Sequence, residues 1–450
     1  MKKIFQYIML AVVTIVMASC TSDIEETTAT TGKNNVQLVV GEFPAFGDSQ
    51  TRAIGTPDEG KTSWAEGDEL LLEIDNTSYG RHNATFTYNG KSWELTSGEL
   101  VYLEGDPAYI SHVYYAPNYK WSNTSLMLKK GKVAGTDELI EGKARITGNG
   151  ETITVSFAEA TRKYSRLRIA TLPNEQITVD TEYFTPAGSS DMEQNGNYTL
   201  TSDEKGNAYL YGTFENNSEV TVKYREAALT TYTFSQATEN AKSYALDATV
   251  ISANSAEEIK SAIEQKVADG KTTIRLNLAP NAGTNEFMAI REAIKGAAPN
   301  DLGTIELTII GVETIPEEAF YKMLQLKSVR MSDVKEIKKY AFKECQYLTV
   351  VEAPSLNKLY SGAFKKCDQL SKLTFGPINY ADARNWPIFE YITPNIDLIL
   401  SDYQKEMIET DSYLYTANND RDYAGSDEHN SKNFLGREFK SITCRYKVEY

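Results

Sequence analysis

The chain contains few of the residues from which catalytic and metal centres are built. It has three histidines, His82, His112 and His429, in 450 residues, and neither His82 nor His112 has another ligand at a motif spacing. Nucleophile-elbow, zinc-protease, phosphate-loop and dinucleotide-binding signatures are missing. We therefore expect a protein that is not an enzyme and has no metal and no cofactor. A two-carboxylate glycosidase stays open as an alternative, because such carboxylates converge only in three dimensions.

Clustered basic residues, long apolar runs and paired cysteines are scarce too. The net charge is −16, and binding to a polyanion needs grouped Lys and Arg, so the composition argues against a nucleic-acid partner. The longest apolar run, residues 4–18, is shorter than the roughly 20 residues that span a bilayer. Beyond Cys20 only three cysteines remain, which is an odd and sparse set and not a disulfide framework.

Residues 1–20 have the organisation of an export signal, because "MKK" precedes the apolar run and small residues follow it. Met17-Ala18-Ser19-Cys20 resembles a bacterial lipobox, with Met17 where Leu is usual, which implies lipid attachment at Cys20. Residues 21–35 are polar and Thr-rich and predict a flexible tether. Their acidic "SDIEE" is similar to the surface-export signal of lipoproteins from the Bacteroides group. We expect an outer-membrane protein, exposed at the cell surface and held to the membrane by its lipid alone.

Residues 36–250 consist of short alternating segments, such as "DELLLEI" and "EVTVKY", separated by Gly, Asn, Asp and Pro. This period of two with regular turn signals predicts antiparallel β-sandwich structure. The length favours two sandwiches in tandem, with a break near residue 150. In the segment "DELLLEI", Leu70, Leu72 and Ile74 are expected to form one face of a strand.

Three short motifs in this region are Thr51-Arg52-Ala53, "WAEGD" from Trp64 to Asp68, and "YYAP" from Tyr114 to Pro117. Together they are similar to the fimbrillin-like (Mfa-like) surface proteins of Bacteroidetes, over about the first half of the mature chain. The resemblance implies a role in adhesion and makes Arg52 a candidate processing site. The competing interpretation is that Arg52 is an ordinary loop residue, that the leading strand "VQLVV" stays in place and that the protein is a monomer.

Two further stretches are candidate ligand sites. A sugar-stacking platform could be formed by Tyr114, Tyr115, Tyr119 and Trp121. The simpler interpretation is that alternate members of this set face the core. Residues 418–428, "NNDRDYAGSDE", space oxygen atoms as in a calcium loop. A tyrosine stands where that loop needs glycine, which favours a plain polar loop.

After residue 250 strands alternate with helices. Ser255 and Glu258 are spaced as a capping box for one helix, and Gly296 is expected to stop a second helix. A sequence repeat follows. Its Ala-Phe pairs begin at Ala319, Ala341 and Ala363 and are therefore evenly spaced. Six apolar columns align in this repeat, one of them formed by Leu326, Leu348 and Leu370. Such a period with L-x-x-L-x-L spacing is typical of leucine-rich repeats.

The repeat "LTVVEAPSLNKLYSGAFKKC" resembles that of the BspA-type proteins. We therefore expect residues 251–450 to form an α/β leucine-rich-repeat solenoid with N- and C-terminal caps. Ala381 stands where an aliphatic residue should fall, so the array is expected to end there, with residues 387–450 as the C-terminal cap. Cys345 and Cys367 share a column and are expected to be small buried hydrophobic residues.

The repeat strands offer a candidate binding surface. If Leu326, Val329 and Met331 point inward, their neighbours point outward, as do the equivalent residues of the next coils. The expected strand face consists of Ser328, Arg330, Val350, Glu352, Lys372 and Thr374. A host or bacterial surface protein or glycan is the expected partner, which makes the chain an adhesin or ligand-binding protein. The alternatives are an accessory or tip subunit of a fimbria, an outer-membrane glycan-binding lipoprotein, or a solvated face without a partner.

Overall fold

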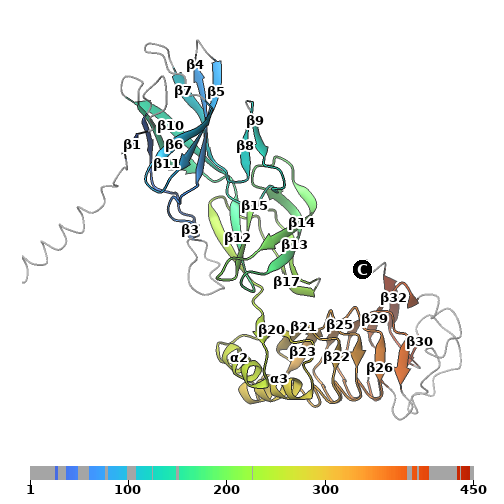
Figure 1. Ribbon diagram of the computed structural model, residues 1–450. Coiled ribbons are helices and arrows are strands. Elements are labelled where there is room, and N and C mark those ends of the chain that lie inside the picture. The colour runs from blue at the N-terminus through green and yellow to red at the C-terminus, as the bar shows by residue number, and fades with distance from the viewer. Residues whose placement is uncertain are drawn as a thin grey trace, which may run out of the picture. The chain divides into compact units, whose positions relative to one another are not determined.

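The structure is a computed structural model that describes residues 26–28, 37–48, 60–76, 80–98, 108–123, 125–147, 152–225, 227–382, 388–392, 395–404, 433–435 and 437–445 (Figure 1). Strands dominate it, and two α-helices lie within these residues. The chain divides into two compact units. One extends to residue 247 without residues 222–230, and the other comprises residues 222–230 and 248–450.

The first unit begins with an eight-stranded sheet. The strands lie in the order β1 (Glu26–Thr28), β2 (Gln37–Val40), β11 (Thr152–Thr161), β10 (Ile140–Thr147), β7 (Ala108–Tyr115), β4 (Glu69–Asn76), β5 (Gly80–Tyr88) and β6 (Trp93–Gly98). All neighbours are antiparallel except β2 and β11. Leu38 of β2 and Trp93 of β6 share one core although they lie near opposite ends of the sheet. The sheet therefore curves round a single core.

The inward face of β4 is the one predicted, since Leu70, Leu72 and Ile74 are all buried in this core. The turn that leads into β4 explains the "WAEGD" motif. Gly67 has a φ of +89°, which disfavours other residues, and the Asp68 carboxylate accepts hydrogen bonds from the Ala65 amide at 2.7 Å and from the Tyr115 hydroxyl at 3.2 Å. The motif thus joins the turn to the aromatic strand β7.

A second sheet follows, largely within the first unit, and its members come from distant parts of the chain. Its order is β17 (Ala227–Thr233), β16 (Glu219–Tyr224), β13 (Gln176–Pro186), β15 (Asn207–Phe214), β12 (Ser165–Ala170), β18 (Lys242–Asp247) and β3 (Gly47–Asp48), with β14 (Glu193–Thr201) also paired to β13. The chain passes from the first sheet to the second between Thr161 and Ser165, later than the expected break near residue 150. β3 belongs to the N-terminal segment and runs parallel to β18.

Two helices open the second unit. α2 (Ala256–Ala268) begins at Ser255, whose side chain accepts from the Glu258 amide as predicted. α3 (Thr284–Ala297) buries Phe287, Ile290 and Ile294. The prediction that Gly296 stops this helix was wrong, because the helix continues through Gly296 and ends after Ala297. A glycine within the last turn costs helix stability but leaves the backbone hydrogen bonds intact.

Parallel strands then stack in two adjoining sheets. The longer one contains β19 (Ile251–Ala253), β20 (Thr273–Leu278), β21 (Ile305–Ile310), β23 (Leu326–Arg330), β25 (Val350–Ala353), β27 (Lys372–Phe375), β29 (Asp397–Ser401) and β32 (Ser441–Arg445). The shorter one contains β22 (Thr314–Ile315), β24 (Glu336–Ile337), β26 (Lys358–Tyr360) and β28 (Tyr380–Asp382). A small hairpin joins β30 (Asn433–Phe434) to β31 (Arg437–Glu438). Each coil from β21 to β28 therefore supplies one strand to each sheet (Figure 1).

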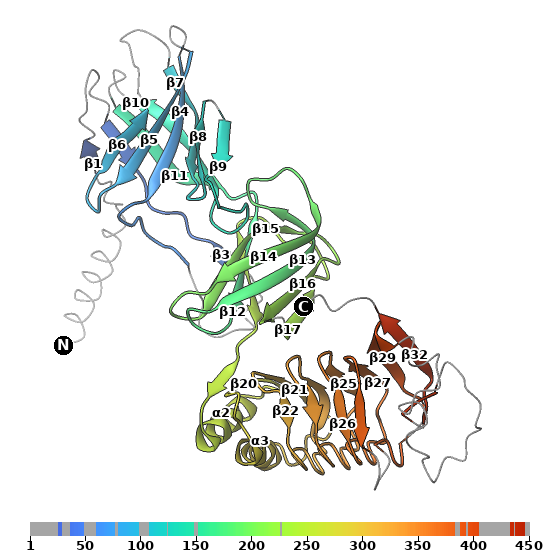
Figure 2. The same ribbon diagram turned by 45° about the vertical axis from the view of Figure 1, so that its right-hand side comes forward.

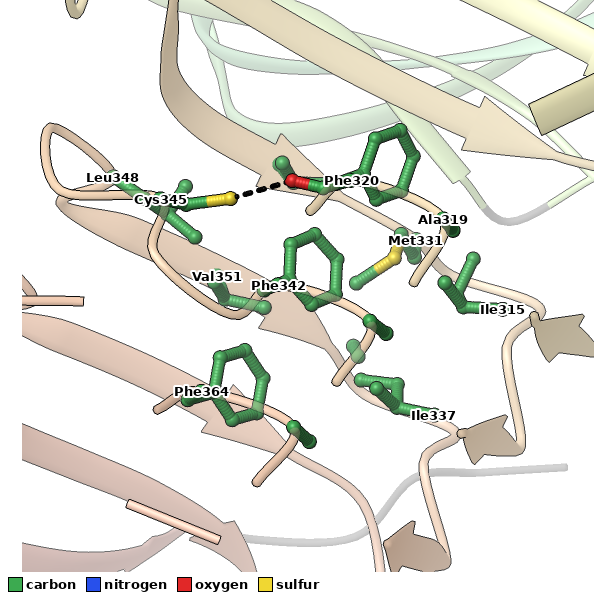
Figure 3. Packing of buried hydrophobic residues seen from close by; sticks show 14 of the residues in the cluster. Ile315, Ala319, Phe320, Met331, Ile337, Phe342, Cys345, Leu348, Val351 and Phe364 are labelled. Atoms are coloured by element: carbon green, nitrogen blue, oxygen red, sulfur yellow. Dashed lines mark hydrogen bonds between the residues drawn. The ribbon is translucent and has the colours of Figure 1, made fainter. Parts of the chain in front are cut away.

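The repeated Ala-Phe pairs form the centre of this unit. Phe320, Phe342 and Phe364 are fully buried and stack along the coils, with centroids 5.1 Å and 5.3 Å apart (Figure 3). The Cys345 thiol, buried as predicted, donates to the Phe320 carbonyl at 2.9 Å. Cys367 donates in the same way to Phe342, at 3.0 Å. The cysteine column thus adds a hydrogen bond between successive coils, which the sequence interpretation did not include.

The expectation that the array ends at Ala381 was wrong. Ala381 is buried on β28, opposite Leu359 of the previous coil, and β29 continues the longer sheet. Phe389 takes the next place in the ring stack, 5.7 Å from Phe364. This coil contains more residues than the coil before it, since Lys372 pairs with Asp397 whereas Val350 pairs with Lys372. The predicted final strand is present as β32, which extends the same sheet.

Candidate ligand-binding strand face

The outward side chains of the longer parallel sheet form two rows across the coils. Ser328, Val350 and Lys372 are paired in register in one row. The other row lies two residues further along each strand and consists of Arg330, Glu352 and Thr374. The structure therefore brings together all six residues of the strand face that the sequence predicted. Their alternate neighbours Val329, Val351 and Leu373 are fully buried, which fixes the orientation of each strand.

Charged groups on this face interact from coil to coil. The Arg330 guanidinium lies 2.9 Å from the Glu352 carboxylate, and the Lys372 ammonium approaches the same carboxylate at 3.8 Å. All three side chains are between 30% and 45% exposed. Two cations thus surround one anion, and the trio has a net positive charge. Ser328 differs from expectation, since its side chain is buried and contributes little exposed surface.

Two further ion pairs flank the strand face. Lys327 lies 2.8 Å from Glu306 on one side, and Lys440 lies 2.9 Å from Asp397 on the other. The Ser441 hydroxyl and then the Lys440 ammonium donate to the Asp397 carboxylate, and these hydrogen bonds lower its pKa. Charged side chains therefore line the face in several coils, with Val350 as an apolar member of one row.

The sequence interpretation missed a charge pattern with the same period as the apolar columns. Lys335 pairs with Glu313, and Lys358 pairs with Glu336, each from the equivalent position of the next coil. Because equivalent positions of adjacent coils lie about 4.8 Å apart, like charges there would repel each other. Aligning the charged columns as well as the apolar ones would have revealed this pattern.

The other candidate residues are placed as follows. Cys20, Arg52 and the calcium-loop stretch 418–428 lie outside the described residues. Tyr115 and Tyr119 are buried in separate cores, whereas Tyr114 and Trp121 are half-buried, with ring centroids 6.1 Å apart. The four aromatic residues therefore do not form one sugar-stacking platform.

Within the described part of the chain, no group of three or more His, Cys, Asp or Glu side chains could hold a metal ion. His112 lies 3.3 Å from the Glu141 carboxylate at the first sheet. The strand face offers ammonium and guanidinium groups that donate to anionic or polar groups, a carboxylate that accepts from donors, and a hydroxyl that can do both. Such groups can bind a ligand of complementary charge.

Comparison with known proteins adds a family assignment for one region. Residues 302–410, about a quarter of the chain, match the family described as "BspA type Leucine rich repeat region", in six copies. The matched region contains the whole strand face. It also extends past Ala381, in agreement with the continued stacking of β28 and β29.

No curated protein matches the chain. Among solved structures, a "putative cell adhesion protein" from Bacteroides fragilis NCTC 9343 is 10% identical, with a TM-score of 0.24, over 51% of this chain and 93% of that one. None of the helices in the described residues is long and apolar enough to cross a membrane.

Proposed function

We propose that the chain is a non-catalytic, lipid-anchored protein of the bacterial outer membrane that acts at the cell surface in adhesion or ligand capture. Its second unit would be a BspA-type leucine-rich-repeat solenoid, and its first unit a fimbrillin-like region that spaces the repeats from the membrane. The observation that carries the proposal is the strand face, where charged and hydroxyl side chains stand in register within the leucine-rich-repeat region.

The chemistry of this face favours an anionic or hydroxyl-rich ligand on a host or bacterial surface. Arg330 and Lys372 together exceed the charge of Glu352, so a carboxylate, sulfate or phosphate group could replace Glu352 as their partner. Thr374 adds a half-exposed hydroxyl beside them. Because the outward positions recur in successive coils, an extended ligand could contact side chains of several coils in a row.

An array of glycans and host-matrix proteins tests this proposal. The protein would consist of residues 21–450, which keep every described element and lack the apolar signal. Binding to a defined subset of acidic glycans or matrix proteins is expected, and the binding should weaken with salt. An array without any specific signal would count against a ligand-binding role.

A second candidate function is an accessory or tip subunit of a fimbria, and the position of β2 favours it. β2 lies near the edge of its sheet, hydrogen-bonded to β11 from Thr152 to Val155. Cleavage after Arg52 would disconnect β2 and could free the edge of β11 for a strand from another subunit. We expect β2 to remain in place, because Leu38 is fully buried in the core of the sheet.

A further inference from the structure

A β-hairpin beside the first sheet has two different faces. It consists of β8 (Tyr119–Ser122) and β9 (Ser125–Leu128), which pair only with each other among the described strands (Figures 1 and 2). Its inner face packs on the sheet, where Tyr119, Trp121 and Leu126 join a small cluster with Leu71 and Ala116. That contact fixes the hairpin and leaves its other face toward solvent.

Large apolar side chains remain exposed on this hairpin and in the turn after it. Met127 is 52% exposed on the outer face, opposite Lys120, and Val133 in the turn is 51% exposed. Leu128 is 40% exposed at the end of the hairpin, on the same side as its partner Tyr119. Single exposed apolar residues are ordinary, whereas several within a short segment indicate a contact surface. The three residues lie close together in the sequence, so they call for a functional explanation.

The same segment is basic in an acidic protein. Residues 119–136 contain four lysines and no Asp or Glu, although the whole chain has a net charge of −16. Lys129 pairs with Glu69 at 2.6 Å, and Lys120, Lys130 and Lys132 are exposed. We call Lys120, Met127, Lys130, Lys132 and Val133 the basic hairpin patch.

Hydrogen bonds hold the patch in one conformation. Asn118 is buried, and its side chain donates to the Val133 carbonyl at 3.1 Å and to the Thr136 hydroxyl at 2.9 Å. Its own backbone carbonyl accepts from the Lys129 amide at 2.8 Å. The exposure of the apolar residues is therefore built into the fold and does not arise from a frayed loop.

We infer that the basic hairpin patch binds the surface of an anionic lipid membrane. The interface of such a membrane offers phosphate groups to the lysines and, within a few ångströms, an acyl boundary to Met127 and Val133. A standard protein–protein interface takes about 20–30 residues from each side, which is more than this small patch contains. If Cys20 carries the proposed lipid, the anchor raises the local membrane concentration, so that a weak patch is sufficient.

Vesicle sedimentation of residues 21–450 tests this inference, since neither lipid anchor nor apolar signal is then present. We expect sedimentation with phosphatidylcholine–phosphatidylglycerol vesicles at low salt and little with phosphatidylcholine alone. The double substitution Lys130→Ala/Lys132→Ala should weaken binding by about 30-fold, because each lysine near an anionic surface contributes about fivefold. Met127→Ser/Val133→Ser should weaken it by about tenfold.

The matched control is Lys91→Ala/Lys205→Ala, which removes two exposed lysines from turns outside the patch. It should bind vesicles like the parent, and thermal melts should confirm that all three variants fold. If the control variant lost as much vesicle binding as the patch variants, net charge alone would explain the binding and the inference would be overturned. Sedimentation of the parent with anionic vesicles at background level would also overturn it and would favour an acidic protein surface as the occupant.

Discussion

Truncating Phe342 tests whether the stacked rings stabilise the second unit. The Phe342 ring is fully buried between Phe320 at 5.1 Å and Phe364 at 5.3 Å. Buried Phe→Ala substitutions cost about 3–5 kcal/mol, and each aromatic pair adds about 0.5–1.5 kcal/mol. Because neighbouring coils hold the cavity open on both sides, we expect Phe342→Ala to cost about 4–5 kcal/mol of unfolding free energy.

Thiol labelling can measure this loss in the second unit alone. In residues 21–450 the only cysteines are Cys345, Cys367 and Cys444, and a Cys444→Ser background leaves the two buried thiols. Burial raises the pKa of Cys345 to about 12, so the folded thiol reacts slowly. Labelling then reports the open population, which Phe342→Ala should raise by about a thousandfold.

Phe214→Ala is the matched control in the first unit. Phe214 is also fully buried between two rings, at 4.4 Å from Phe184 and 4.7 Å from Phe234. This substitution should leave labelling of the cysteines nearly unchanged. The stacking argument would be refuted if Phe342→Ala lowered the unfolding free energy by less than about 1 kcal/mol, which corresponds to a rise in labelling of less than roughly fivefold.

Four other outcomes are expected. Burial raises the pKa of Cys345 from 9.0 to about 12, so the unfolded chain loses this proton first as the pH rises. The second unit should therefore lose stability between these two pH values, by at most about 1.4 kcal/mol per pH unit. Denaturant titrations should show this slope, and Cys345→Ala should remove the part that Cys345 contributes. A double-mutant cycle on Glu336 and Lys358 should give a favourable coupling that shrinks as salt is added; no coupling would refute a stabilising role for the charge repeat. Radiolabelled fatty acid should enter the wild type and not Cys20→Ala, and added protease should cleave the protein on intact cells. Purified 21–450 should stay monomeric in light scattering even after limited cleavage at Arg52, and regular oligomers after cleavage would favour the fimbrial subunit.

The repeat columns could be predicted because every coil places equivalent residues in one environment. Leu326, Leu348 and Leu370 are all nearly or fully buried, as their alignment indicates. The continuation beyond Ala381 could not be predicted in this way. The coil that leads from Lys372 to its partner Asp397 is longer than the one from Val350 to Lys372, and Ile388 replaces the alanine of the Ala-Phe pair.

The first unit shows where local patterns lose their predictive value. Alternation in β4 predicted its buried face, since that depends on neighbouring residues only. The parallel pairing of Gly47 with Lys242 joins segments from opposite ends of this unit, and no short motif marks it. The curvature of the first sheet likewise follows from packing between distant strands.

The strand face was predictable as a set of positions but not as a set of contacts. Period two placed Arg330, Glu352 and Lys372 outward. The ion pairs between them depend on the register of adjacent coils, and the burial of Ser328 depends on its surroundings. Its ligand-binding role is still a proposal.

The most direct test of that proposal compares two double variants with the parent on the glycan and matrix array. Arg330→Ala/Lys372→Ala removes both cations of the strand face, and Lys260→Ala/Lys335→Ala removes two exposed lysines elsewhere in the second unit. If the strand face binds the ligand, the first variant loses the array signal by about tenfold or more, and the second keeps it. Equal signals from the parent and the first variant would contradict the proposed role of the strand face.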